Sequence, residues 1–142
     1  HRIKGIGPNS WGMSASISPS TGYSGHYGSH PIGVGHKLLE DGTVAPYGAL
    51  SFLPFTPLES KAALEHMYKI PGLVGKYGLY DAYSYATKAK ADQPWIAKSY
   101  LGIDKGLVLL MFENYSTQLI WRLLHQNAHI QKGLKVLRFE SK

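Results

Sequence analysis

Glycine and proline are concentrated in the first 58 residues of this chain, and this distribution limits the regular structure that the segment can form. Ten of the 16 glycines and six of the eight prolines in the 142-residue sequence lie there. Between Gly5 and Thr43 most residues are Gly, Ser, Pro, Tyr or His, a composition typical of turns and irregular loops. Only residues 14–18 are compatible with a short strand. A loop of this length is uncommon in a compact domain and usually carries function.

Two helices are predicted near the end of this segment. Residues 45–55 are compatible with a helix that has Pro46 in its first turn. A stronger pattern follows, because Thr56 is a favoured N-cap residue and Pro57 suits the first helical position. This second helix is predicted to end at Ile70, where a Pro-Gly pair cannot continue it.

The C-terminal part predicts a long helix after a second irregular, Tyr-rich region at residues 72–106. We expect the helix over residues 105–126, with Asp104 as its N-cap and a bend near residues 114–116, and a short helix over 128–136. The long helix begins with a run that is apolar on every side, which indicates a buried central helix. Three or four helices, two large loops and no alternation of strands with helices predict an all-α fold class.

Charge and apolar runs exclude two classes of function. The chain carries 15 Lys and Arg against 9 Asp and Glu, a net charge of +6. These basic residues are scattered and form no stripe, so we expect no nucleic-acid partner. The longest apolar run has six residues, far below the ~20 of a membrane-spanning helix, so we expect no membrane span.

Neither a metal ion nor another cofactor is expected. The chain has no cysteine, which excludes disulfides, thiolate metal sites and a cysteine nucleophile. His26, His30 and His36 share one loop, but their spacing is not that of a known zinc motif.

Three carboxylates stand out because their sequence neighbours are apolar or aromatic: Asp81, Asp104 and Glu113. A carboxyl group in such surroundings must be paired, hydrogen-bonded or raised in pKa, and a raised pKa suits a general acid. Structural alternatives stay open for each of them. Asp81 would tether a loop, Asp104 would cap a helix, and Glu113 would be a buried hydrogen-bond partner of the backbone or a tyrosine.

Aromatic residues form the second group of candidates, since many lie in predicted loops or at helix starts. They are Trp11, Tyr23, Tyr27, Tyr47, Tyr80, Tyr83 and Trp95. Sugar rings stack on aromatic faces, and neutral saccharides need no strong electrostatic field, in keeping with a charged fraction of 17%. The pattern therefore indicates a saccharide cleft. The alternative is that each Tyr fills a half-buried site with its hydroxyl in water.

Five ordered motifs resemble the bacterial glucoamylase-like glycoside hydrolase domain, a family that includes endo-β-1,2-glucanases and the related domain of cyclic β-1,2-glucan synthases. The motifs are SWGMSAS at 10–16, DGTVAPY at 41–47, YGLYDAY at 77–83, YLGIDKG at 100–106 and MFENY at 111–115, followed by Trp121. The resemblance extends over about residues 9–139.

The resemblance implies that residues 1–142 are the C-terminal half of an (α/α)6 toroid with long Gly- and Tyr-rich loops, whose N-terminal helices are missing. The rest of the domain, or another chain, is then an expected partner. The implied activity is hydrolysis of a β-glucan, with a β-1,2-linked glucan as the candidate, by two carboxylates in a central cavity. Such enzymes are usually periplasmic or exported.

The same resemblance implies roles for individual residues. Asp104 is the favoured cavity carboxylate and Asp81 the second, while at least one catalytic carboxylate lies upstream of this sequence. Glu113 is assigned to structure. The residues expected to contact glucose units of the oligo- or polysaccharide substrate are Trp11, Tyr23, Tyr47 and Tyr80. Two other classes stay open: a non-catalytic glycan-binding domain and a structural interaction domain.

Overall fold

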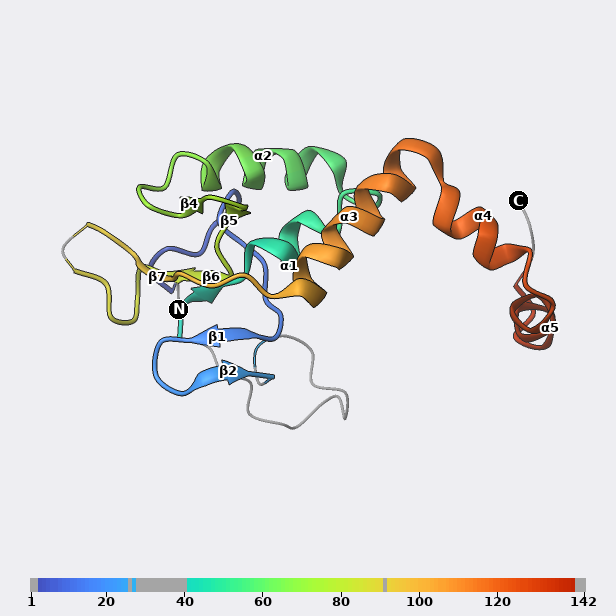
Figure 1. The fold of residues 1–142 in the computed structure, drawn as a ribbon, viewed down its shortest axis with the longest axis horizontal. Coiled ribbons are helices and arrows are strands. Elements are labelled where there is room, and N and C mark those ends of the chain that lie inside the picture. The colour runs from blue at the N-terminus through green and yellow to red at the C-terminus, as the bar shows by residue number, and fades with distance from the viewer. Residues whose placement is uncertain (1–2, 26, 28–40, 91, 140–142) are drawn as a thin grey trace.

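The computed structural model describes residues 3–25, 27, 41–90 and 92–139. These residues form short strands and five helices, arranged as a body of strands and two helices from which three further helices extend (Figure 1). In chain order the elements are β1 (Ser16–Ser18), β2 (Gly22–Ser24), β3 (Thr43–Val44), α1 (Pro46–Leu50), α2 (Pro57–Met67), β4 (Val74–Gly75), β5 (Gly78–Leu79), β6 (Ala82–Ser84), β7 (Trp95–Ala97), α3 (Gly102–Thr117), α4 (Leu119–His125) and α5 (Ala128–Val136).

The prediction of an all-α fold class is wrong. Within the described residues, three antiparallel sheets accompany the helices: β1–β2, β3–β6–β7 and β4–β5. In the three-stranded sheet, Tyr83 of β6 lies opposite Val44 of β3 and Ile96 of β7. Each strand has only two or three residues. Such strands are too short for an alternation of apolar and polar residues to be recognised in the sequence.

Two helices agree with the predicted positions. Helix α2 begins directly after Thr56 and has its Pro at the first helical position, although it ends three residues earlier than predicted. Helix α5 has the predicted bounds, and the side chain of Asn127 caps it by accepting hydrogen bonds from the N–H groups of His129 and Ile130.

The long C-terminal helix differs from its prediction in two ways. Helix α3 begins at Gly102 with Leu101 as N-cap, so Asp104 lies in the first turn and is not the N-cap. The predicted single helix is also divided in two, because Gln118 adopts a left-handed conformation with φ of 58° between α3 and α4. No described helix is long and apolar enough to cross a membrane.

The hydrophobic core joins α1 and α2 to strands β3, β5 and β6. Its members are Val44, Ala49, Leu50, Ala63, Met67, Ile70, Leu73, Leu79 and Tyr83. The hydroxyl groups of Tyr83 and Ser10 lie 2.8 Å apart in this core. Because the single Ser10 proton is donated to the carbonyl of Gly5, Tyr83 is the donor to Ser10. Burial raises the pKa of Tyr83 to about 12, so this donor keeps its proton at physiological pH.

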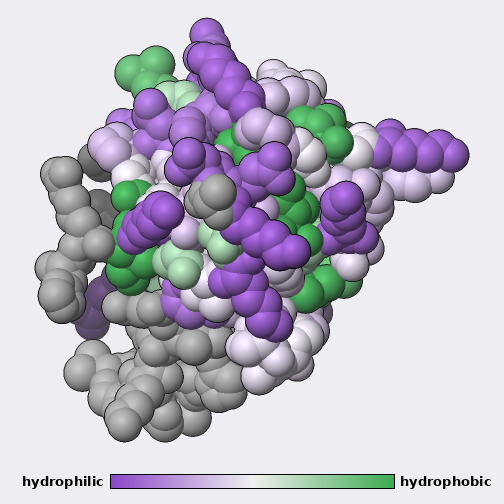
Figure 2. Space-filling view, turned by 90° about the vertical axis from the view of Figure 1, so that its left-hand side faces the viewer, coloured by the Kyte–Doolittle hydropathy of each residue, from purple (hydrophilic) through white to green (hydrophobic). Residues whose placement is uncertain are grey.

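Helices α3, α4 and α5 extend away from the core, as Figure 1 shows. Helix α3 was predicted to be buried on all sides, yet Leu107, Leu109 and Leu110 are exposed, Leu109 to 70%. The opposite end of the molecule presents hydrophilic residues with separate hydrophobic ones among them (Figure 2). The helical extension exposes further large apolar side chains, including Leu123 and Leu124 of α4.

Candidate functional site

Asp81 and Asp104, which we call the aspartate pair, come together where the first turn of α3 meets the strands. Their side chains are buried, with 4% and 5% of their areas exposed. Asp81 lies between β5 and β6, and its N–H donates to the carbonyl of Ser99 at 3.1 Å, in the segment that leads into α3. Its Oδ2 accepts a 2.7 Å hydrogen bond from the N–H of Ile17 in β1. Three parts of the chain therefore hold the aspartate pair in place.

The surroundings of the aspartate pair favour a proton between the two side chains. Asp81 Oδ1 and Asp104 Oδ2 are buried, and no group in the described part of the chain donates a hydrogen bond to either atom. Two ionised carboxylates are acceptors only, so a hydrogen bond between them needs a proton on one of them. Burial, and then the hydrogen bond and negative charge of Asp81, raise the pKa of Asp104 to about 7. Asp104 is therefore a carboxyl group that can exchange a proton near neutral pH.

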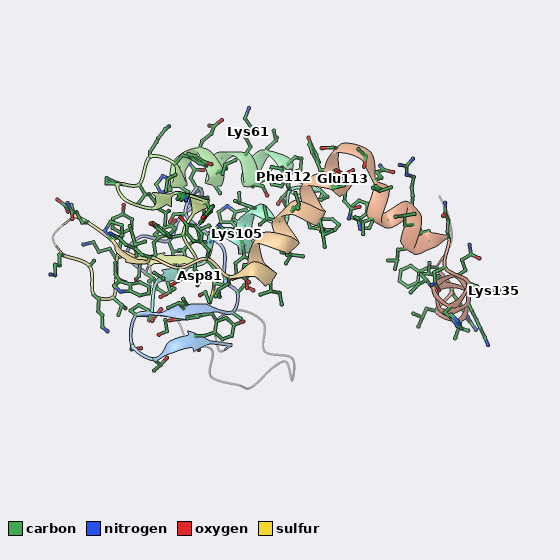
Figure 3. All side chains as sticks on the ribbon, viewed as in Figure 1. Lys61, Asp81, Lys105, Phe112, Glu113 and Lys135 are labelled. Carbon is green, nitrogen blue, oxygen red and sulfur yellow. The ribbon has the colours of Figure 1, made fainter. Side chains whose placement is uncertain are left out.

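Lys105 lies beside the aspartate pair, and sequence reasoning did not identify it. Its Nζ donates a hydrogen bond to the carbonyl of Leu79 and lies 5.5 Å from the centre of the Tyr100 ring. Figure 3 shows Asp81 and Lys105 close together at the start of α3. Burial lowers the pKa of Lys105, while the charges of the aspartate pair oppose that decrease. The sequence signal that could have revealed it is its position directly after Asp104 at the start of an apolar helix.

Two of the predicted substrate-binding aromatics lie near the aspartate pair. Tyr47 is in α1, and its hydroxyl oxygen lies 2.7 Å from both Ser14 Oγ and the carbonyl oxygen of Ala15. Burial raises the pKa of Tyr47, and charges on Asp104, Tyr23 and Asp81 raise it further. Tyr23 in β2 is 59% exposed, so its ring is open to contact by a ligand.

Tyr80 belongs to a separate aromatic cluster that Lys105 connects to the pair. The rings of Tyr80 and Tyr100 lie 4.9 Å apart, and those of Tyr77 and Tyr100 lie 5.4 Å apart. A hydrogen bond with Tyr100 raises the pKa of Tyr80. The fourth predicted residue, Trp11, packs against the hydrophobic core.

Glu113 takes part in a local contact within α3. Its Oε1 accepts a 2.6 Å hydrogen bond from Thr117 Oγ1, and Figure 3 places it well along α3 from Asp81. The buried polar residue in this part of the chain is Asn114, whose Oδ1 accepts the N–H of Trp121 at 3.1 Å. Asn114 thereby connects α3 to α4.

The histidine loop considered for metal binding lies outside the described residues. Among the residues that the structure describes, no group of three or more His, Asp or Glu side chains is placed to hold a metal ion.

Comparison with known proteins gives consistent relatives. Residues 1–128 match the family model described as "Putative glucoamylase". The exo β-1,2-glucooligosaccharide sophorohydrolase (non-reducing end) of Parabacteroides distasonis is 32% identical over 136 residues, covering 94% of this chain and 17% of that protein. A solved β-1,2-glucanase from the same organism is 32% identical with a TM-score of 0.73, covering 94% of this chain and 17% of its own.

A third relative is the solved endo-β-1,2-glucanase from Chitinophaga pinensis, in complex with sophorotriose and glucose. It is 38% identical with a TM-score of 0.75, and the match covers 99% of this chain and 31% of that one. The present chain therefore spans less than a third of the length of each of these relatives.

Proposed function

Because the chain belongs to the glucoamylase-like family of glycoside hydrolases, we propose that it is part of an enzyme that cleaves a β-glucan. The observation that carries this proposal is the buried aspartate pair, in which Asp104 keeps a proton up to about pH 7. A carboxyl group of this kind can protonate the leaving oxygen of a glycosidic bond. The β-1,2 linkage is supported by the names of the relatives described above.

We assign the proton-donating role to Asp104 and regard Asp81 as its immediate partner. Hydrogen-bonded carboxyl groups have oxygens about 2.5–2.7 Å apart, whereas the two catalytic carboxyl groups of glycosidases are separated by roughly 5–9.5 Å. The aspartate pair therefore acts as one unit on one side of the scissile bond. The second catalytic carboxylate comes from a part of the natural protein outside this sequence.

The aromatic residues divide into two proposed roles. Tyr47 and Tyr23 are assigned to the sugar unit that reacts. The charges of Asp104 and Asp81 act on Tyr47, and Tyr23 lies opposite Ile17, whose N–H binds Asp81. Tyr80, stacked on Tyr100, offers a contact for a neighbouring sugar unit. The assignment of Trp11 to substrate binding stays a prediction.

We further propose that other parts of the natural protein cover the apolar sides of α3 and α4. The exposed leucines of these helices and the greater length of the relatives support this arrangement. A structure of the natural protein in which Leu109 remained exposed would contradict it. A closed toroidal cavity and an exported or periplasmic location stay predictions.

The function is tested by incubating the natural protein that carries this sequence with linear β-1,2-glucan. We expect release of oligosaccharides, measured as new reducing ends, and little or no release from a β-1,3-glucan of similar length. Binding of β-1,2-glucan without release would instead indicate a glycan-binding domain. Neither binding nor release would indicate an interaction domain and would also contradict the proposal.

The pH dependence of hydrolysis should reflect Asp104. Since its pKa is raised to about 7, the protonated form persists to near-neutral pH and is lost above it. For a general acid, kcat/KM should therefore fall as the pH rises through about 7, with a tenfold decrease per pH unit beyond that point. Initial rates measured from pH 4 to pH 9 test this. A decrease at low pH belongs to the second catalytic carboxylate, which must be ionised. A rate that stays constant or rises as the pH increases through about 7 would contradict the assignment of Asp104 as the acid.

A further inference from the structure

Lys105 has no part in the proposed proton transfer, yet its surroundings are unusual for a surface lysine. It follows Asp104 in the first turn of α3, and its side chain is only partly exposed. Its Nζ donates to the carbonyl oxygen of Leu79, two residues before Asp81. The Lys105 side chain of α3 thus holds the backbone of β5 close to Asp81.

Lys105 brings a positive charge to the aspartate pair. This charge lowers the pKa of Asp104, against the larger effects of burial and of Asp81 that raise it. Other titratable groups near this region include Tyr47 of α1, Tyr23 of β2, and Tyr80 and Tyr100, whose rings lie 4.9 Å apart. The Tyr100 ring lies 5.5 Å from the Lys105 Nζ. A phenol carries no positive charge in either of its protonation states. Among these groups, Lys105 is the one whose positive charge acts on Asp104.

We propose that Lys105 is a positioning residue for the aspartate pair: its ammonium group fixes the strand next to Asp81 through the Leu79 carbonyl and places a positive charge beside the two carboxyl groups. The inference deepens the proposed function and rests on it for the activity measurement only. Lys105 need not touch the substrate for this role. Lys105 acts by fixing the position of Asp81 and by changing the protonation of Asp104.

Removing the positive charge of Lys105 should raise the pKa of Asp104. A nearby cation favours the ionised carboxylate, so removing it makes the proton on Asp104 harder to remove. The pH at which Asp104 loses its proton then moves upward by roughly one unit. The limb of the pH–rate profile that Asp104 controls moves to higher pH whether Asp104 acts as acid or as base.

The experiment compares Lys105→Met with Lys105→Arg in the natural protein. Methionine keeps an unbranched side chain but removes the charge and the donor, so the limb should move upward by roughly one pH unit. Arginine keeps the charge and should return the limb to within a few tenths of a unit of the wild type. The matched control is Lys135→Met, because Lys135 is exposed on α5 far from the pair, as Figure 3 shows, and the limb should not move.

A second measurement does not depend on glucan hydrolysis. The folded-state pKa of Asp104 lies above its unfolded value of about 3.9, so the stabilisation from its proton is present at low pH and is lost as the pH rises through about 7. In Lys105→Met this loss should extend to higher pH, observed as a shift in the plot of Tm against pH. The shift should vanish when Asp104→Asn is present in both proteins compared.

The outcomes separate the two proposals. If the wild type hydrolyses no glucan, the proposed function fails, and the Tm profiles still decide the role of Lys105. If Lys105→Met lowers activity or Tm equally at every pH, Lys105 is merely structural and the inference is overturned while the function stands. Should Lys105→Met not fold, Lys105→Gln replaces it, because glutamine keeps an N–H donor without the charge.

Discussion

Replacing Asp104 with asparagine is expected to lower β-glucan hydrolysis by the natural protein by about 10²–10⁴-fold, the contribution typical of one acid–base group. Asparagine has nearly the shape of a neutral carboxyl group, so it can occupy the same buried position and still hydrogen-bond to Asp81. It cannot give or take the proton. Glucan affinity should change by no more than a few-fold. The two quantities are measured as kcat/KM on linear β-1,2-glucan and as Kd by calorimetry.

The control for this variant is Asp92→Asn. Asp92 lies in the exposed turn before β7, so the same chemical change there should leave both hydrolysis and binding unaltered. Equal losses of binding and hydrolysis in Asp104→Asn would make Asp104 a ligand contact and not an acid. Unchanged hydrolysis would remove Asp104 from the reaction altogether.

The members of the aspartate pair could be recognised from sequence, but their contact could not. Each has apolar or aromatic neighbours, which marks a carboxyl group that must be paired or protonated. Their approach depends on the hydrogen bond from Asp81 to Ser99 and on the amide of Ile17, contacts between distant parts of the chain. Lys105 was missed because a lysine near a helix start is usually solvated, and only the tertiary structure places it against Leu79.

Local signals predicted helices and did not predict the sheets. The start of α2 follows from Thr56 and Pro57, whose effects on a helix start are confined to neighbouring residues. The strands depend on pairing across long separations, as between Val44 and Tyr83. No two- or three-residue segment carries enough periodicity to reveal such a partner.

Helix α3 shows a different limit of sequence reasoning. A run that is apolar on all sides predicts burial, but burial depends on which neighbours are present. Leu109 and Leu110 are exposed in the structure of this chain, which spans 31% of the Chitinophaga relative and 17% of the Parabacteroides relatives. The apolar pattern indicates the surroundings that the helix requires, and we propose that other parts of the natural protein supply them.

Gly12→Ala is expected to destabilise the natural protein by about 2–4 kcal/mol. Gly12 has φ of 129°, a conformation that residues with a Cβ rarely adopt. A Cβ there would also collide with the carbonyl oxygen of Ala45 and lie 2.9 Å from the backbone nitrogen of Ala49. The first atom belongs to the N-cap residue of α1 and the second to the helix itself. This backbone cannot move away without breaking the hydrogen bond from the Ala45 N–H to the Gly12 carbonyl.

The measurement is the shift of the urea unfolding midpoint, with Gly7→Ala as the matched control. Gly7 has no atom within 4 Å of the position its Cβ would take, so alanine there should change the unfolding free energy by less than about 0.5 kcal/mol. The carbonyl of Gly12 accepts a hydrogen bond from Ala45, which connects β3 to α1, and α1 carries Tyr47. Substitution of Gly12 should therefore also lower hydrolysis through the position of Tyr47. A Gly12→Ala protein as stable as Gly7→Ala would show that the start of α1 can shift freely. The close contact between the backbone of Gly12 and that of α1 would then not be needed to hold Tyr47 near the aspartate pair.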